Sequence, residues 1–283
     1  MARAKGWLAA AMAVGVLMAS VPASADEAEV HYRVARRHKQ AGRLDEALTE
    51  AREAVRLRPK HAQAHFVIGT VLYEKGKYEP AALALKKAAR LDPDFAAAAA
   101  MLGTTYMRLR KYEAAAGALK AAVRLAPQDA TSWSNLGVAL RKLDKNEQAI
   151  RAYREGLKHA PKDVGLLNNH AVALRRADRF EEAIEMLEQA LERGAEDWQV
   201  HLNLAIALRS AERYEEAIPH YEKVLQAQPK NGDAWFDLGV SHEQLGHRRK
   251  AIRAYEKYVE VVGGRDREKA RQAQALIENL QGQ

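Results

Sequence analysis

Apolar residues recur along this chain with the spacing of an α-helix. One stripe of a helix, spaced i, i+3, i+4 and i+7, consists of Trp133, Leu136, Gly137 and Leu140. A polar break at 144–146 separates it from a second apolar stripe in residues 149–157. Pro161 follows, and proline lacks the backbone donor that a helix interior needs. Residues 130–163 are therefore predicted to form two helices joined by a turn.

This pattern returns every 34 residues without an insertion or deletion. A small residue recurs at that period, as Ala35, Gly69, Gly103, Gly137, Ala171, Ala205 and Gly239. Twelve residues after each comes an alanine: Ala47, Ala81, Ala115, Ala149, Ala183, Ala217 and Ala251. The predicted units are 28–61, 62–95, 96–129, 130–163, 164–197, 198–231 and 232–265. Short side chains in phase let two helices approach closely, so each unit is predicted to be a tight helical hairpin.

The 34-residue period, the W-x-x-L-G sequence at Trp133, the mid-unit alanine and the terminal proline resemble the tetratricopeptide repeat family. The likeness covers residues 28–265, and segment 64–93 is another clear copy. It implies an all-α fold, an α-solenoid of seven helix-turn-helix repeats that forms a right-handed superhelix with a concave groove. Family members are mostly scaffolds that hold peptides or partner domains.

The two ends of the chain lie outside the repeats. Residues 266–283 contain one amphipathic helix, which is predicted to cap the last repeat; its apolar side carries Ala270, Ala273, Ile277 and Leu280. The repeat domain thus occupies 26–265.

The first 25 residues have the three zones of a secretory signal peptide. A basic start precedes an uncharged apolar stretch, and small residues at 23–25 precede Asp26. The apolar stretch is shorter than the roughly 20 residues that span a bilayer, which disfavours a membrane anchor. We expect cleavage before Asp26, export without stable membrane insertion, and a periplasmic destination if the protein is bacterial. A secreted eukaryotic chain would more often contain cysteine, and this chain has none.

The composition limits the kinds of functional site that this protein can have. The absence of cysteine excludes disulfides, thiolate metal sites and cysteine nucleophiles. The net charge of +8 could suit nucleic acid or an anionic polymer, but the basic residues are interspersed with glutamates, and export disfavours nucleic acid. The ten histidines form no metal-binding pattern on one helix face. No phosphate-binding loop or catalytic triad can be assembled, so we predict a non-enzymatic protein without cofactor or metal.

One polar feature recurs on the first helices. Three asparagines, each leading a related hexamer, are Asn135, Asn169 and Asn203. Asn135 lies about 160° from the core stripe, taking 100° per residue. In the family this side lines the groove, where an amide can both donate to and accept from a peptide backbone. The alternative interpretation is that these asparagines serve solubility or contacts between helices.

Basic residues accompany the asparagines. Six residues after the asparagines come Arg141, Arg175 and Arg209, and seven residues after the first two come Lys142 and Arg176. Arg108 holds the place of Lys142 one unit earlier. These basic residues predict a peptide ligand with acidic side chains, although exposed arginines often have only solvent as a partner. A less charged part of the predicted groove contains Phe66, Tyr73, Thr104 and Met107, and exposed apolar surface suggests a partner.

Three functions fit these features. The first is an exported scaffold that binds an extended peptide or a partner protein in the groove. The second is a regulatory or targeting subunit that docks a folded envelope enzyme or secretion component on the apolar surface. The third is a binder of anionic polymers. The partner's identity and the oligomeric state stay open.

Overall fold

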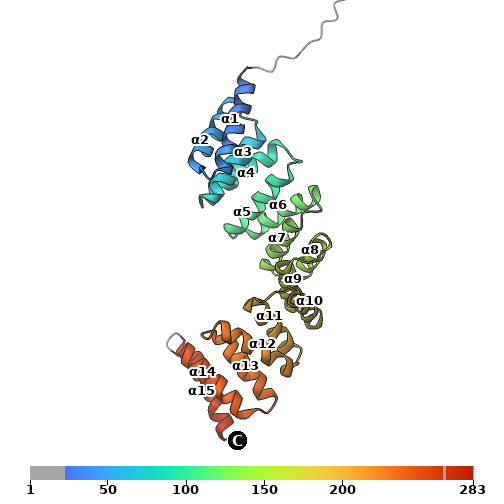
Figure 1. The fold of residues 1–283 in the computed structure, drawn as a ribbon, viewed down its shortest axis with the longest axis vertical. Helices are drawn as coiled ribbons and strands as arrows, with labels where there is room; N and C mark the ends of the chain where they lie inside the picture. Colours follow the sequence, from blue (N-terminus) through green and yellow to red (C-terminus); the bar gives the residue numbers. More distant parts are fainter. Residues whose placement is uncertain (1–22, 264–265, 283) are drawn as a thin grey trace, which may run out of the picture.

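The protein, described here from a computed structural model, is a linear stack of helices. The structure describes residues 23–263 and 266–282, and within them it contains fifteen α-helices and no strand (Figure 1). In chain order these are α1 (Ala23–Gln40), α2 (Leu44–Leu57), α3 (Ala62–Glu74), α4 (Tyr78–Leu91), α5 (Ala96–Arg108), α6 (Tyr112–Leu125), α7 (Ala130–Lys142), α8 (Asn146–His159), α9 (Val164–Arg176), α10 (Phe180–Glu192), α11 (Trp198–Ser210), α12 (Tyr214–Ala227), α13 (Gly232–Gln244), α14 (Arg248–Val262) and α15 (Arg267–Gly282).

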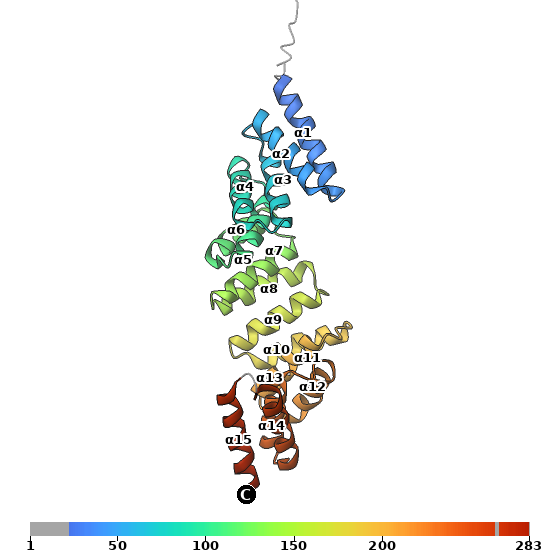
Figure 2. The same cartoon turned by 90° about the vertical axis from the view of Figure 1, so that its left-hand side faces the viewer.

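Helices pair in chain order, and each pair packs on the next. From α3 onward the first helix of each pair begins 34 residues after the previous one, and successive pairs stack along the long axis (Figure 2). The predicted all-α solenoid is therefore confirmed. In the five units that end on a proline, the second helix stops just before the proline; in the unit with Pro161, for example, α8 ends at His159.

Small residues sit where the two helices of a pair cross. A Cβ built on Gly137 would lie 2.4 Å from Cε1 of Tyr153, and one on Gly69 would lie 2.5 Å from Cγ of Leu85. The mid-unit alanines, such as Ala149, are fully buried. The crossing is thus as close as the sequence predicted, because there is no room for a larger side chain.

The turn inside each pair has one residue in the left-handed region. Glycine occupies it in three turns: Gly42, Gly76 and Gly246, with φ of 73°, 72° and 71°. The other four turns keep the same conformation with residues that have a side chain: Arg110, Asp144, Asp178 and Glu212, with φ between 55° and 59°. The turn is therefore set by the packing of the two helices rather than by glycine.

The two ends differ in what the structure describes. The predicted signal peptide lies outside the described residues over 1–22, and its last three residues fall at the beginning of α1. In the described part of the chain, no helix is both long and apolar enough to cross a membrane. At the other end α15 packs on α14 and buries Ala273, Ile277 and Leu280.

Candidate peptide-binding groove

The first helices of the later repeats begin at equivalent, capped positions. A side-chain oxygen caps the helix start in α7, α9, α11 and α13, and the capping residues are Asp129, Asp163, Asp197 and Asn231. The Asp163 carboxylate, for example, accepts a hydrogen bond from the Leu166 amide at 2.9 Å. Because these helices start in phase, equivalent residues line up on the surface that the first helices share, which we call the first-helix face.

The three predicted asparagines lie half-buried along this face, at the seams between neighbouring first helices. Asn135 donates to the Thr104 hydroxyl of α5 at 3.4 Å, and Asn203 donates to the Asn168 carbonyl oxygen of α9 at 2.8 Å. Among the described residues the side chain of Asn169 makes no hydrogen bond. Two of the three amides therefore join neighbouring repeats, while each keeps a carbonyl oxygen for other contacts.

Arg141, Arg175 and Arg209 form a second row, which we call the Arg stripe. All three are half-buried, and the Nε atom of each is buried without a hydrogen-bond partner among the described residues. Arg141 and Arg175 also form no ion pair within the described part of the chain. The pKa of Arg175 is lowered, first by burial and then by Arg176, Arg209 and Arg141. An anion placed over this stripe would relieve that repulsion.

At the α13 end of the Arg stripe, Arg209 lies close to an acidic residue of the protein itself. Asp237 of α13 occupies the place that the asparagines hold in earlier repeats, and its carboxylate lies 3.5 Å from Nε of Arg209. It also accepts a hydrogen bond at 3.2 Å from the hydroxyl of Tyr221, which is fully buried. Burial raises the pKa of both Asp237 and Tyr221. Arg209 is thus partly neutralised, whereas Arg141 and Arg175 are not.

The other predicted basic residues lie one position further along, at the helix ends. Arg108, Lys142 and Arg176 are exposed. Arg108 donates from Nε to the Tyr73 hydroxyl at 3.1 Å, and Arg176 lies 3.9 Å from the Asp144 carboxylate. These three side chains flank the Arg stripe, and two of them, Arg108 and Arg176, have partners of their own.

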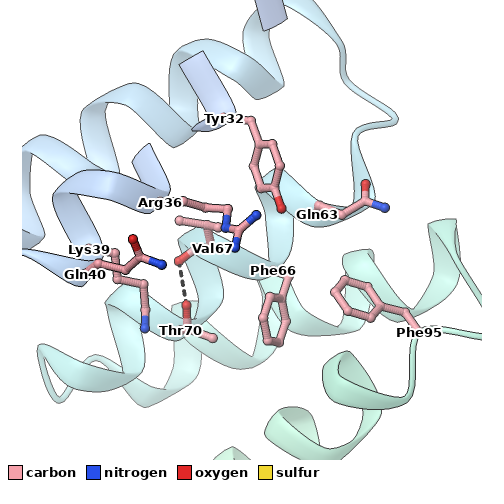
Figure 3. Close-up of a pocket in the computed structure, with 9 residues that line it drawn as sticks. All are labelled: Tyr32, Arg36, Lys39, Gln40, Gln63, Phe66, Val67, Thr70 and Phe95. Atoms are coloured by element: carbon pink, nitrogen blue, oxygen red, sulfur yellow. Dashed lines mark hydrogen bonds between the residues drawn. The ribbon is translucent and has the colours of Figure 1, made fainter. Parts of the chain in front are cut away.

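A hollow of about 420 Å³ opens on the first-helix face between α1 and α3 (Figure 3). Its apolar wall contains Tyr32, Phe66 and Phe95, and the rings of Phe66 and Phe95 lie 4.9 Å apart. Arg36 and Lys39 of α1 also line it, and the Arg36 guanidinium lies over the Tyr32 ring, 5.8 Å from its centroid. Phe66 is therefore where the sequence placed it, on a surface open to a ligand.

The other three residues of the predicted apolar surface contact neighbouring residues of the protein. The ring of Tyr73 packs on Tyr78 at 5.3 Å, and the hydroxyl of Thr104 donates to the Ala100 carbonyl at 3.0 Å. Met107 packs against the core. Each of these three half-buried side chains therefore has contacts within the protein.

A second hollow, of about 620 Å³, lies at the other end of the face, between α11, α13 and α15. We call it the α13–α15 cleft. Its apolar lining is Ile206, Phe236, Tyr258 and Leu276, and its charged lining is Arg209, Asp233, Asp237 and Lys269. It contains Phe236 at the position equivalent to Phe66, so both hollows are the same inter-repeat site at opposite ends.

Two pairs of histidines come together in the structure. The Nδ1 atoms of His201 and His220 lie 2.9 Å apart, and those of His242 and His247 lie 3.4 Å apart. No group of three or more potential ligands gathers within the described residues. With two imidazoles and no third ligand, these pairs lack the donor set of a structural metal site.

Comparison with known proteins gives the family. The family model described as the C-terminal domain of cilia and flagella-associated protein 70 matches residues 1–234, and the model described as tetratricopeptide repeat matches residues 208–280. The chain belongs to the tetratricopeptide repeat family. Proteins of this family are generally non-enzymatic scaffolds for protein–protein interaction. A search of curated proteins finds no match.

Solved structures of other repeat proteins show the same fold. The TPR protein YrrB, whose structure is described as having an unusual peptide-binding site, is 23% identical with a TM-score of 0.58, over 62% of this chain and 90% of YrrB. PilF from Pseudomonas aeruginosa is 18% identical with a TM-score of 0.60, over 73% of this chain and 94% of PilF. MamA from Desulfovibrio magneticus RS-1 is 24% identical with a TM-score of 0.55, over 59% of this chain and 95% of MamA. At these identities the likeness establishes the fold.

Sequence reasoning missed parts of both hollows in this TPR protein. Phe95 precedes α5 and reaches back over α3, and the contributions of α15 come from outside the 34-residue period. One signal was present: Phe66 and Phe236 stand at the same place in units two and seven, five periods apart.

Proposed function

We propose that this TPR protein is an exported, non-enzymatic scaffold that holds an extended, acidic segment of a partner protein on its first-helix face. The observation that carries the proposal is the Arg stripe. The Nε atoms of Arg141 and Arg175 are buried with no hydrogen bond and no ion pair within the described residues. A buried, unpaired donor on a cation costs free energy that a carboxylate ligand can offset through charge-assisted hydrogen bonds.

The asparagines support the same ligand. Asn169 stands free between the two asparagines that join repeats, and its amide can pair with a peptide group whatever the ligand's side chains are. Fold likeness to YrrB, with its peptide-binding site, is consistent with a peptide ligand.

Export rests on the N-terminal pattern of charge and small residues. Cleavage before Asp26 would leave Ala28, a buried side chain of α1, in the mature protein. It would also leave Asp26 in the first turn, where an acid complements the helix dipole.

Peptide binding can be tested by fluorescence anisotropy with a synthetic twelve-residue peptide that carries glutamate at every third position. The variant Arg141→Gln/Arg175→Gln should lose about tenfold or more in affinity, because each charge-assisted hydrogen bond contributes about 1.5–3 kcal/mol. The matched control is Arg124→Gln/Arg151→Gln, which removes the same charge from exposed sites on α6 and α8. Equal losses in both variants would show that net charge, and not the Arg stripe, attracts the peptide.

A salt titration separates this function from binding of anionic polymers. Affinity for a polymer should fall steeply with salt, because many counterions are released on binding. Affinity for the peptide should fall modestly, and the triple variant Asn135→Ala/Asn169→Ala/Asn203→Ala should lower it further at every salt concentration.

A further inference from the structure

The α13–α15 cleft is open because the last helix, α15, packs against only one other helix. Every first helix from α1 to α11 approaches the next first helix in the stack, but in the described residues the backbones of α13 and α15 have no Cα atoms within 8 Å of each other. Helix α15 packs on α14 instead, at the C-terminal end of the stack (Figure 2). The apolar side of α13 therefore remains open over Phe236, facing Leu276 of α15.

The cleft suits an uncharged, bulky side chain. Its two basic and two acidic lining residues balance, and three of the four have partners: Asp237 pairs with Arg209, and Lys269 lies 3.5 Å from Asp266. The volume of about 620 Å³ lies within the range of roughly 300–1,000 Å³ that is common for ligand pockets. Burying an apolar side chain against these walls is favourable, and the one lining charge without an ion pair among the described residues, Asp233, is exposed.

The cleft is continuous with the Arg stripe, because Arg209 belongs to both. Neighbouring packed helices lie roughly 8–10 Å apart, and an extended chain advances about 3.3 Å per residue. Each step between first helices therefore corresponds to about three residues of ligand. From Arg175 on α9 to Phe236 on α13 there are two steps, or about six residues.

We propose that the α13–α15 cleft is an anchor subsite for one bulky apolar side chain of an extended acidic peptide, about six residues from the acidic residue that pairs with Arg175. The proposal rests on the peptide-binding function of the first-helix face and adds a position-specific requirement to the ligand.

The test compares three labelled peptides, each made in both chain directions, by fluorescence anisotropy. All carry two glutamates three residues apart. The anchored peptide has leucine six residues beyond the second glutamate, the anchorless peptide has serine there, and the shifted peptide has the leucine three residues nearer. In one chain direction, the anchored peptide should bind wild type about tenfold tighter than the other two, as burial of one leucine side chain predicts.

Two variants test whether the leucine of the anchored peptide binds in the α13–α15 cleft. Gln272→Trp on the exposed rim of α15 should fill the mouth of the cleft and reduce the affinity for the anchored peptide to that for the anchorless one. Gln274→Trp, an exposed position on the same helix outside the cleft lining, should leave the tenfold difference intact.

The outcomes distinguish the two proposals. Equal binding of all three peptides, with a loss in Arg141→Gln/Arg175→Gln, would overturn the anchor subsite alone. No binding of any peptide would overturn both proposals. Self-association of wild type that Gln272→Trp abolishes would show that a second copy of this chain fills the cleft, and would also overturn the anchor subsite.

Discussion

At the scale of single residues, the same residue type has opposite roles at two places in neighbouring helices. Gly137 on α7 faces the buried ring of Tyr153, and a Cβ there would lie 2.4–2.7 Å from three ring atoms. Gly117 on α6 is exposed, and a Cβ there would meet nothing within 4 Å. Only the first glycine is required by packing.

Gly137→Ala should therefore destabilise the protein by about 1–3 kcal/mol, because the fully buried Tyr153 has no free space to move into. Gly117→Ala should stabilise it by roughly 0.5–1 kcal/mol, because alanine loses less conformational entropy in a helix. Urea unfolding followed by circular dichroism measures both. A stabilised Gly137→Ala variant would contradict the close crossing.

At the scale of elements, the sequence predicted the positions of the helices more completely than the conformation of the turns. The apolar phase and the prolines predicted the helix pairs. Pro219, however, lies inside α12, where it removes one backbone hydrogen bond without ending the helix. The left-handed conformation in the four turns without glycine was also not predicted, since the residues that adopt it show no common type.

The left-handed residues of these turns lead to a prediction about the stability of the protein. Glu212 has φ of 59°, a region that costs a residue with a side chain roughly 1–2 kcal/mol. Glu212→Gly should relieve this strain and stabilise the protein by about 0.5–1 kcal/mol after the entropy lost by glycine is subtracted. The reverse change, Gly246→Ala, should destabilise it by about 1 kcal/mol. Midpoints of urea unfolding at constant slope would measure both, and a destabilised Glu212→Gly would show that the glutamate side chain matters more than its backbone.

At the scale of the whole molecule, stability is linked to pH through buried histidines. Burial is the first cause that lowers the pKa of His170, His220 and His242 to about 4. Arg154 and Arg179 add to this effect at His170, whose two ring nitrogens are buried without hydrogen bonds. A histidine whose pKa is lower in the folded state is held neutral there, while the unfolded chain takes up a proton near pH 6.5.

The folded state should therefore be fully stable above about pH 6.5 and should lose stability as pH falls towards 4. His170 should account for about 1–2 kcal/mol of the loss between pH 7 and pH 5. His170→Leu places at this site the leucine found at the equivalent positions Leu102, Leu136 and Leu204. This variant should be more stable than wild type at pH 7 and should show a shallower decline in urea unfolding at pH 5. An unchanged decline would mean that His170 does not titrate with unfolding.

By itself the sequence determined the helices, their pairing and the face that each one buries. These depend on a local apolar phase and on small residues that recur every 34 positions, and both can be read without knowing the neighbours. Only the tertiary structure decided which polar groups of the first-helix face have partners. Asn203 is joined to Asn168 and Asn135 to Thr104, whereas within the described residues the Nε atoms of Arg141 and Arg175 have no hydrogen-bond partner. These outcomes depend on distances between repeats. The open cleft between α13 and α15 was likewise decided by how the last helix packs, since residues outside the repeat have no periodic neighbour to align with.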